Sequence, residues 1–440
     1  MSALGSVASP PRPPVQDPVV PERVKSPQRA VTELVAAVLA IVALALVTGT
    51  IDVVIFATCI IVIIMIHELG HLLAAKRGGM KVTEYFLGFG PRLWSFRRGE
   101  TEYGVKALPL GGYVKIPGMT NLEEVDPADE ARTYREQPFH ARLLVAVAGS
   151  AMHFLMALVL LWVLFAFVGQ PDNSKIQVQG LVTIGGHPGP AAVAGLRNGD
   201  ILVSVNGKHI DGDDRVLTRS IQDSAGRPVT VVVDRNGRTV ALQVTPDDDR
   251  VVREPGVDLP AGHAPYGVIG VSLGSPTQYE NPVSAVGSAV VGLGQSIWST
   301  IDGVVHVFEP SAVVGRFQQI ASAKAAAKAS ADGTRVQSIV GVVNTGGQAV
   351  QAGLADTLWL LVVINLFLGV FNMFPMLPLD GGHVVIAVYE KIRTGRSKVA
   401  YHADASKLMP FTWLMLSFLA VLFVTALLVD VLHPMSNPFR

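Results

Sequence analysis

The sequence predicts a polytopic α-helical membrane protein with about five spans and a folded α/β domain outside the membrane. Half of its 440 residues are hydrophobic and only 16% are charged, against roughly 25% charged in an ordinary soluble protein. Lys+Arg and Asp+Glu are equal at 35 each, so no global charge indicates a nucleic-acid partner. The single cysteine, Cys59, excludes an internal disulfide and a thiolate metal cluster.

The membrane-spanning prediction rests on five apolar stretches, because crossing the hydrocarbon core takes about 20 residues. The stretches are residues 34–51, 53–66, 143–168, 357–379 and 411–429. Lysines and arginines gather in the N-terminal tail, after the second stretch and after the fourth. Five crossings put all three basic clusters on one side, as expected for the cytoplasmic face. The region between the third and fourth stretches is therefore expected outside.

These stretches divide the chain into nine expected segments. They are a disordered Pro-rich cytoplasmic tail (1–30), an extra N-terminal span (31–50), a second span (51–75), a membrane-associated β region (80–120), a third span (141–168), an external domain (176–275), an amphipathic or linker region (280–353), a fourth span (354–383) and a fifth (410–432).

Three of these segments leave alternatives open. The first span is also compatible with a signal segment, although the tail is long for one and no clear A-x-A cleavage site follows. Residues 283–301 are uncharged but rich in Gly and Ser, and we expect a helix on the outer surface. If that helix spanned the membrane, both later spans would reverse direction. Residues 310–335, with an Ala-rich run, predict a linker or a solvated helix.

The second span ends in His67-Glu68-Leu69-Gly70-His71, an H-E-x-x-H pattern. On a helix, positions i and i+4 share a face, so both imidazoles can bind one zinc ion while the Glu beside them meets a water molecule. A helix starting near residue 51 carries His67 about 24 Å along its axis, within a roughly 30 Å core. Ionisable groups at that depth are costly unless they have a function, so a metal site is favoured over two capping histidines.

A hydrolytic zinc site needs a third protein ligand and an open position. Most acids near apolar stretches lie at their ends, as interface residues do, and these are Glu33, Asp52, Asp356 and Asp430. Asp380 differs because it follows 23 uncharged residues, in N-M-F-P-M-L-P-L-D-G-G-H. The two prolines break the helix, and Gly381 and Gly382 are expected to loosen it further. Asp380 is the predicted third ligand; His383 is a second choice, more in keeping with a capping or loop residue.

The two motifs together resemble those of the site-2 intramembrane metalloproteases, with H-E-x-x-H at the end of one span and N-x-x-P-x-x-P-L-D-G-G-H ending a later one. The order of elements is similar to the bacterial branch that regulates envelope-stress sigma factors, and to its actinobacterial members in particular. The resemblance covers about residues 50–440. It implies one zinc ion bound by His67, His71 and Asp380, with Glu68 activating the water and Asn372 holding the substrate backbone.

The sequence departs from the family pattern at His153, and alternatives remain for Asn372 and for the β region 84–113. The third span reads A-G-S-A-M-H where the family often shows G-P-x-x-N, so His153 stands at the Asn position. A neutral packing role for His153 is favoured over one that modulates the site. For Asn372 the less favoured alternative is a helix-packing amide. Glycines and aromatics in 84–113 predict strands and tight turns, and the family implies a β-hairpin that dips into the membrane; a small cytoplasmic β-loop is the alternative.

The external region resembles a permuted bacterial PDZ domain. Its core is G-P-A-A-V-A-G-L-R-N-G-D-I-L-V-S-V-N-G, and Y-G-V-I-G-V further on is similar to a carboxylate-binding loop. The substrate-binding residues expected there are Gly267, Val268, Ile269 and Gly270. Backbone N–H groups of such a loop capture a chain terminus while the peptide adds as a strand. A domain that only excludes bulky ectodomains is the alternative.

The resemblance implies a zinc-dependent endopeptidase of the bacterial cytoplasmic membrane, and the basic residues of the tail place its N-terminus inside. Its partners would be the lipid bilayer, single-span substrates such as anti-sigma factors or signal-peptide remnants, and an upstream site-1 protease that trims them. The rivals are a catalytically silent PDZ scaffold with a structural metal, an anchored zinc protease with a soluble active site, and a metal transporter. Glu68 disfavours the silent scaffold, and the apolar run before His67 disfavours the anchored protease. The presence of a single polar cluster disfavours the metal transporter.

Overall fold

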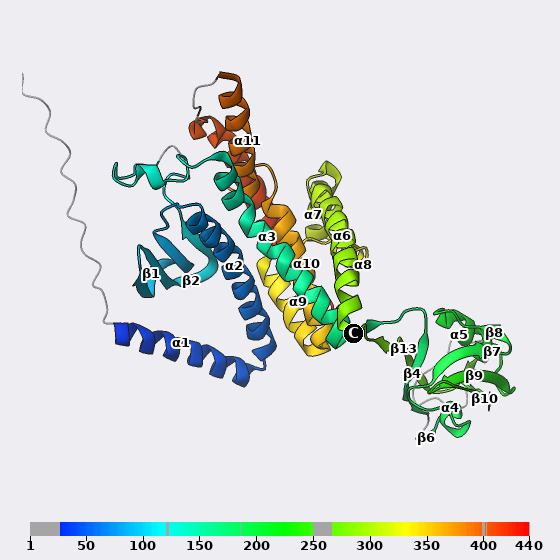
Figure 1. Ribbon diagram of the computed structural model, residues 1–440. Coiled ribbons are helices and arrows are strands. Elements are labelled where there is room, and N and C mark those ends of the chain that lie inside the picture. The colour runs from blue at the N-terminus through cyan, green and yellow to red at the C-terminus, as the bar shows by residue number, and fades with distance from the viewer. Residues whose placement is uncertain are drawn as a thin grey trace, which may run out of the picture. The chain divides into compact units, whose positions relative to one another are not determined.

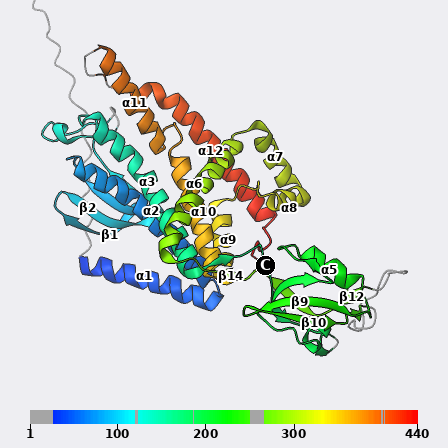
Figure 2. The ribbon, with the colours of Figure 1, turned by 45° about the vertical axis from the view of Figure 1, so that its right-hand side comes forward.

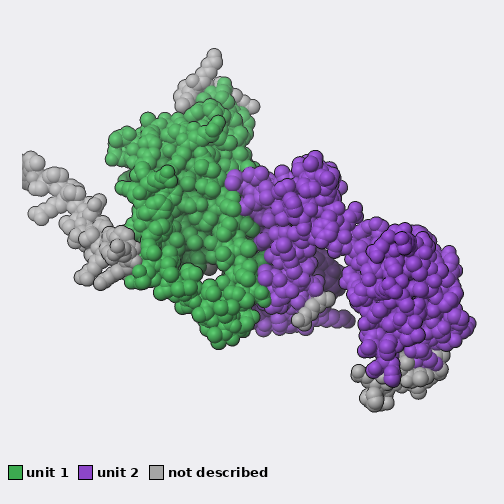
Figure 3. All heavy atoms as spheres, turned by 60° about the horizontal axis from the view of Figure 1, so that its bottom comes forward, with its two compact units in different colours: residues 1–151, 373–423 green, residues 152–372, 424–440 purple. Residues whose placement is uncertain are grey.

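A computed structural model describes residues 27–119, 123–184, 186–249, 266–397, 401 and 403–439. The expected Pro-rich tail lies outside the described residues up to residue 26. The chain forms two compact units, each built from two separate stretches (Figure 3). Unit 1 comprises Met1–Ala151 and Met373–Phe423, and unit 2 comprises Met152–Asn372 and Val424–Arg440. Unit 1 is therefore interrupted in sequence by most of unit 2.

Five helices in the described part of the chain are long and apolar enough to cross a membrane, which is the predicted number. They are Val31–Thr48 within α1 (Pro27–Thr48), α2 (Ile51–Arg77), α3 (Phe139–Val163) with the π-helical turn Leu164–Val168, α10 (Leu354–Asn372) and α12 (Met409–Leu432) (Figures 1 and 2). Many of their large apolar side chains are exposed, including Leu39, Val159 and Phe423. Such exposure fits helices surrounded by lipid, so the protein is a multi-pass membrane protein.

The β region of unit 1 is more elaborate than a simple hairpin. Strands β1 (Glu84–Arg98) and β2 (Thr101–Lys115) are antiparallel, and residues of the first half of β1 pair with both halves of β2. Phe86, for example, pairs with Gly104 on one side and Tyr113 on the other. Both strands therefore bend back into a sheet of four segments. Gly88 and Gly90 have positive φ where β1 bends, a conformation that glycine adopts without steric cost.

This sheet lies beside α2 (Figures 1 and 2). The core between them is completed by the start of α3, and it contains Leu72, Ala75, Met80, Val82, Ile116 and Val145. Lys76 at the end of α2 donates a hydrogen bond of 2.7 Å to the hydroxyl of Tyr103 in β2. The second half of α2 is thus held by packing on a folded layer rather than by lipid alone.

Unit 2 contains a six-stranded antiparallel sheet with its own hydrophobic core. Its strand order is β10-β9-β7-β4-β13, with β8 (Lys208–His209) paired to β7. The other strands are β4 (Ile176–Leu181), β7 (Ile201–Val205), β9 (Val229–Arg235), β10 (Arg238–Val244) and β13 (Val271–Gly274). Val229, Val231 and Val233 alternate inward along β9 and are fully buried, as the period of a strand requires. Helix α5 (Asp214–Gln222) contributes Leu217 and Ile221 to the same core.

The remaining strands are short pairs of two residues each. They are β3 (Gln170–Pro171) with β14 (Thr277–Gln278), β5 (Thr183–Ile184) with β6 (His187–Pro188), and β11 (Asp247–Asp248) with β12 (Gly267–Val268). Helix α4 (Pro190–Val193) lies between β6 and β7 in the chain.

The region expected to be amphipathic or a linker is built of four helices. They are α6 (Pro282–Val307), α7 (Pro310–Ala321), α8 (Ala323–Ala331) and α9 (Ile339–Ala352). Helices α6 and α9 lie beside α10 (Figure 2). Ala326 and Ala329 of α8 are buried. The other residues of α8 are half-buried or exposed, so the linker or solvated helix expected for 310–335 stays a prediction.

The fourth span ends earlier than expected. Helix α10 stops at Asn372, residues 373–379 form turns, and a new helix, α11 (Asp380–Ser397), starts at the predicted metal ligand. The prolines at 375 and 378 interrupt the helix, since neither can donate a backbone hydrogen bond. Asp380 consequently lies in the first turn of a helix rather than in a loosened helix end.

Candidate metal centre

The two histidines of the H-E-x-x-H pattern lie on one face of α2, near its C-terminal end. Their Nε2 atoms are 3.2 Å apart, and both residues are buried. Nδ1 of His71 donates a 2.8 Å hydrogen bond to the carbonyl oxygen of Val145 in α3. That bond fixes the tautomer, so the Nε2 lone pair of His71 is free to bind a metal. The i,i+4 spacing thus places two imidazole nitrogens close together.

Asp380 brings the third donor to the same point. Its Oδ2 lies 3.3 Å from Nε2 of His71 and 3.5 Å from Nε2 of His67. In a tetrahedral zinc site, bonds of about 2.0–2.1 Å place neighbouring ligand atoms about 3.3 Å apart. Among the described residues, these three form the one group of His, Cys, Asp or Glu with such spacing. Two imidazoles and a carboxylate are a donor set of catalytic zinc sites, so the residues present fit zinc.

Gly149 of α3 packs directly against the two imidazole rings. A Cβ at this position would overlap Cε1 of His67 and Nε2 of His71. The backbone of α3 therefore touches both ligands, and only a residue without a side chain fits there. Sequence reasoning passed over Gly149, because its role depends on how α3 crosses α2 and not on a local pattern.

Gly381 and Gly382 have a role that differs from the predicted one. A Cβ on Gly381 would collide with the backbone of Met373, and one on Gly382 would lie 2.6 Å from the backbone nitrogen of Leu377. The turns at 373–379 therefore wrap closely around the first turn of α11. The expectation that these glycines loosen the helix is wrong, because they permit the tight packing that fixes the backbone beside Asp380.

Glu68, the predicted proton carrier, faces the β sheet of unit 1. A Cβ on Gly112 of β2 would lie 3.2 Å from Cγ of Glu68 and 3.0 Å from Sδ of Met65. Tyr85 of β1 donates a 2.7 Å hydrogen bond to the carbonyl oxygen of Met65. Burial, followed by the nearby Glu68 carboxylate, raises the pKa of Tyr85 to about 12, so its hydroxyl remains a donor. The sheet edge at 112–115 thus borders Glu68.

The two other histidines considered from the sequence are outside this ligand group. His383 in α11 makes an edge-on ring contact with Tyr134, with centroids 6.2 Å apart. His153 is buried in unit 2, where its Nδ1 lies 3.1 Å from Oδ1 of Asn365. Asn365 in turn donates to the carbonyl oxygen of Leu361 at 2.8 Å. Because an amide oxygen only accepts, His153 donates here, as the neutral packing interpretation expects.

The predicted substrate-binding residues all lie in unit 2. Asn372 is the last residue of α10. Gly267 and Val268 form β12, and Ile269 and Gly270 connect it to the edge strand β13. The carbonyl oxygens of Ile269 and Gly270 accept backbone hydrogen bonds of 2.9 Å from Ala191 and Val182. This loop is thereby tied to the main sheet, and its role and that of Asn372 stay predictions.

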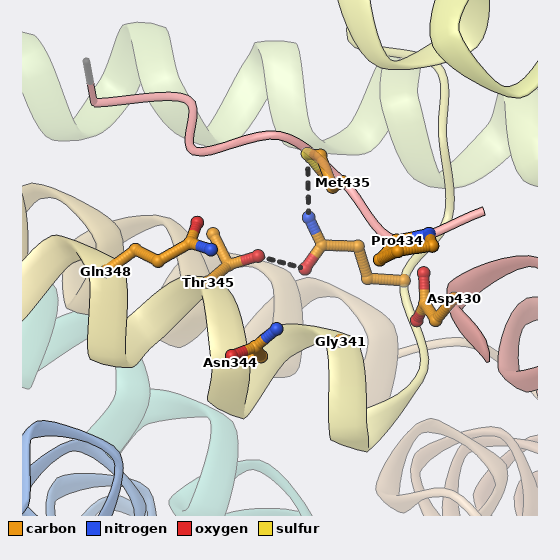
Figure 4. A pocket seen from close by; sticks show the side chains of 8 residues that line it. Gly341, Asn344, Thr345, Gln348, Asp430, Pro434 and Met435 are labelled. Carbon is orange, nitrogen blue, oxygen red and sulfur yellow. Dashed lines mark hydrogen bonds between the residues drawn. The ribbon is translucent and has the colours of Figure 1, made fainter. Parts of the chain in front are cut away.

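A second polar cluster in unit 2 corrects the expectation for Asp430. Its carboxylate is almost fully buried, receiving hydrogen bonds from Arg335 at 2.8 Å and from the backbone and hydroxyl of Ser338 at 2.7 and 2.8 Å. Asp430 is therefore not an ordinary interface residue, since it holds Ser338, the N-cap residue of α9. A cavity of about 30 Å³ beside it is lined by Asn344, Gln348 and other polar groups (Figure 4). A cavity of that size takes water rather than a peptide.

With the geometry described, comparison with known proteins identifies the family. The sequence matches peptidase family M50 over residues 55–417. The chain belongs to peptidase family M50. Zinc metalloprotease Rip1 of Mycobacterium tuberculosis is 34% identical over 411 residues, which cover 88% of the chain and 98% of that protein. Rip1 of Mycolicibacterium smegmatis is also 34% identical, over 417 residues and the same shares.

More distant relatives carry similar descriptions. A putative zinc metalloprotease of Rhizobium meliloti is 27% identical over 349 residues, covering 77% of the chain and 86% of that protein. The predicted family resemblance is thus confirmed. The M50 membership makes the protein a zinc metalloendopeptidase, and the prediction of zinc as the cofactor is confirmed with it.

Proposed function

We propose that this M50 peptidase cuts the membrane-spanning segments of proteins that another protease has already trimmed, the second or site-2 step of regulated intramembrane proteolysis. The observation that carries the proposal is the meeting of His67, His71 and Asp380 at the end of an apolar helix, with Glu68 beside them. A metal of purely structural role needs no such base, which disfavours the silent scaffold. The apolar run before His67 disfavours an anchored protease with a soluble site.

We assign the site residues as follows. His67, His71 and Asp380 would hold zinc, which would act as a Lewis acid toward a peptide carbonyl and a water molecule. The carboxylate of Glu68 takes a proton from the attacking water and returns it to the leaving amine. The hydrogen bond from His71 to Val145 and the close contact at Gly149 hold both imidazoles in place during the reaction.

A transmembrane substrate has to be unwound before its carbonyls can be attacked, because helical hydrogen bonds occupy them. The edge segment 112–115 of β2 is a natural acceptor for the unwound strand, since it borders Glu68 and has backbone groups for β-augmentation. Asn372, with both donor and acceptor atoms on its amide, is assigned to hold the substrate backbone.

The six-stranded domain of unit 2 is assigned as a permuted PDZ-like domain. Two features support this: β13 is an edge strand, and the loop Gly267–Gly270 leads directly into it. A peptide would add to the free side of β13 while its carboxylate meets backbone N–H groups of that loop. Exclusion of bulky ectodomains is the alternative role, and either role delays cleavage until the substrate has been trimmed.

We place the protein in a bacterial cytoplasmic membrane, with its basic clusters inside and the PDZ-like domain outside, because Lys and Arg mark cytoplasmic flanks. The helix α6 stays assigned to the outer surface and α1 to a retained anchor. The proposed substrates are single-span membrane proteins such as anti-sigma factors or signal-peptide remnants. The proposed partner protease makes the preceding site-1 cut in the same substrate.

The test is cleavage of a single-span reporter without its ectodomain by the full-length protein, reconstituted in liposomes with zinc. We expect Glu68→Gln to lower the rate about 10²–10⁴-fold, because it removes the proton carrier, while zinc remains bound. Glu100→Gln is the matched control: Glu100 forms an exposed pair with Arg132 at the turn of the β sheet. Mass spectrometry of the products locates the cut.

Each outcome separates the candidates. A cut inside the hydrocarbon-spanning segment that disappears in Glu68→Gln supports the proposal. A cut in a soluble flank favours the anchored protease instead. Bound zinc without cleavage of several such reporters would leave the scaffold as the better description.

A further inference from the structure

A second buried cluster in unit 1 lies outside the metal centre. Arg142 in α3 donates a hydrogen bond from Nη1 to Oε2 of Glu390 in α11, and the two side chains are only 11% and 5% exposed. Replacing such a pair by apolar groups is often neutral or stabilising, whereas removing one partner is strongly destabilising. The Arg142–Glu390 pair is therefore better explained by the position it gives α11 relative to α3 than by added stability.

Both helices that the pair joins also reach the metal centre. Seven residues after Arg142, α3 places Gly149 against the rings of His67 and His71. Ten residues before Glu390, α11 begins with Asp380, whose carboxylate meets the same two rings. Helices α3 and α11 are thus linked at two levels, through the two imidazoles of α2 and through the ion pair. At 1.5 Å per residue the two levels are separated by about 10–15 Å along the helices.

The contacts between these levels run along the same face of α11. The ring of His383 lies against Tyr134, and Ala387 is 1% exposed. Tyr134 donates from its hydroxyl to the carbonyl oxygen of Arg142 at 3.2 Å. Glu390 also accepts a 2.6 Å hydrogen bond from the backbone N–H of Ala403, which follows α11 in the chain. Glu390 thereby ties α11 to α3 and to the segment leading into α12.

We infer that the Arg142–Glu390 pair is a positioning device for the third metal ligand: it holds α11 at its middle so that Asp380 stays at ligand distance from His67 and His71. The inference rests on the proposed metal site. Asp380 is the one ligand that α2 does not carry, so its place depends on α11. A tilt of α11 by about 5° around Glu390 moves Asp380 by about 1.3 Å over a 15 Å arm. A displacement of that size breaks a metal site, which tolerates about 0.5 Å.

The test compares metal binding by full-length variants in detergent micelles. Glu390→Gln removes the charge but keeps an acceptor for Ala403. The chain offers a matched control in Asp430→Asn, because Asp430 forms an equally buried pair with Arg335 in unit 2, with side chains 8% and 3% exposed. The readouts are affinity for Zn²⁺ by chelator competition, the visible spectrum of bound Co²⁺, and the thermal unfolding temperature.

We expect Glu390→Gln to weaken zinc binding at least tenfold and to change the Co²⁺ spectrum, as loss of supporting residues around metal ligands does. Asp430→Asn should lower the unfolding temperature while zinc affinity and spectrum stay as in the wild type. Wild-type zinc affinity and an unchanged spectrum in Glu390→Gln would overturn the inference, whatever happens to its stability. Equal losses of zinc affinity in both variants would overturn it too.

A second variant covers the case in which Glu390→Gln does not fold. Arg142→Lys keeps the buried charge pair but replaces the planar fork of donors by a single ammonium, so the fold is retained while α11 is held less firmly. We expect its zinc affinity to lie between those of the wild type and of a variant without Asp380. An affinity equal to the wild type would contradict a positioning role. Failure of the wild type itself to bind Zn²⁺ or Co²⁺ would instead reject the proposed metal site.

Discussion

The metal centre of unit 1 and the antiparallel sheet of unit 2 are held in place by different means. At the metal centre, backbone touches functional groups directly: Gly149 meets two imidazoles, and Gly381 and Gly382 meet the preceding turns. In the sheet, interlocking aliphatic side chains such as Val231, Val233 and Leu202 fill the interior. Adding one carbon atom at these glycines would displace groups of the metal centre. Removing a few carbon atoms from the aliphatic side chains would destabilise the sheet.

This difference separates chemistry from stability. The close contacts at the metal centre fix where three ligand atoms lie, so a perturbation there changes metal binding before it unfolds the protein. The core of the sheet stabilises the folded domain of unit 2, whereas the metal ligands belong to unit 1. A perturbation there therefore changes the free energy of unfolding and leaves those ligands in place. Substitutions at matched positions can test that separation.

The largest effect is expected for Gly149→Ala. The new methyl group would overlap Cε1 of His67 and Nε2 of His71, so one ring has to leave its ligand position. We expect zinc affinity to fall about 100-fold or more, with most of the activity lost. Gly395→Ala in α11 is the control, because a Cβ there meets nothing within 4 Å. Chelator competition measures both, and wild-type affinity in Gly149→Ala would refute the close-contact interpretation.

A smaller effect, on stability alone, is expected for Leu202→Ala. Leu202 is 3% exposed in the core of the sheet, and truncating such a residue costs about 2–5 kcal/mol. Hydrogen exchange of β7 and β9 should speed up while zinc affinity stays unchanged. Val193→Ala, at a site 77% exposed, should leave both unchanged. A loss of zinc affinity in Leu202→Ala would show that the two regions are not separable.

The smallest effect depends on pH and comes from Asp200. Burial raises the pKa of Asp200, but hydrogen bonds from Arg235 and the backbone N–H of Arg197 outweigh it and lower the pKa below its usual range. A lowered pKa in the folded state stabilises the domain above the ordinary value of about 3.9, and this stabilisation is lost as the pH falls through the lowered value.

For Asp200→Asn we therefore expect a loss of about 2 kcal/mol at pH 7, typical of a hydrogen bond to a charged group. The difference from the wild type should shrink as the pH falls below 4. Hydrogen exchange of β7 and β9 at a series of pH values measures it. A difference that is constant between pH 7 and pH 3 would mean that Asp200 acts through shape and not through its charge.

The sequence could predict the features that local periodicity determines. The i,i+4 spacing of His67 and His71 and the isolated carboxylate of Asp380 after a long apolar run pointed to the three ligand atoms that the structure brings together. The number of apolar helices followed from their length. In both cases the relevant physics, helical repeat and desolvation cost, acts within one segment.

Other features depend on which distant segments meet, and a single sequence does not contain that information. The partner of Arg142 is 248 residues away, and Gly149 matters only because α3 crosses the histidines. Asp430 was misassigned as an interface residue because its partner Arg335 lies 95 residues earlier, in the segment between α8 and α9. The four-segment sheet at 84–115 was expected as a hairpin, since its bends at glycines become visible only with the long-range pairing.

The interruption of unit 1 by unit 2 has a consequence for biosynthesis. His67 and His71 belong to an early helix, while Asp380 is made about 300 residues later, after nearly all of unit 2. At a synthesis rate of about 5–20 residues per second, that interval lasts roughly 15–60 s. During this time the nascent chain has two of its three proposed zinc ligands, so the proposed site becomes complete only after the domain that would screen its substrates has been made.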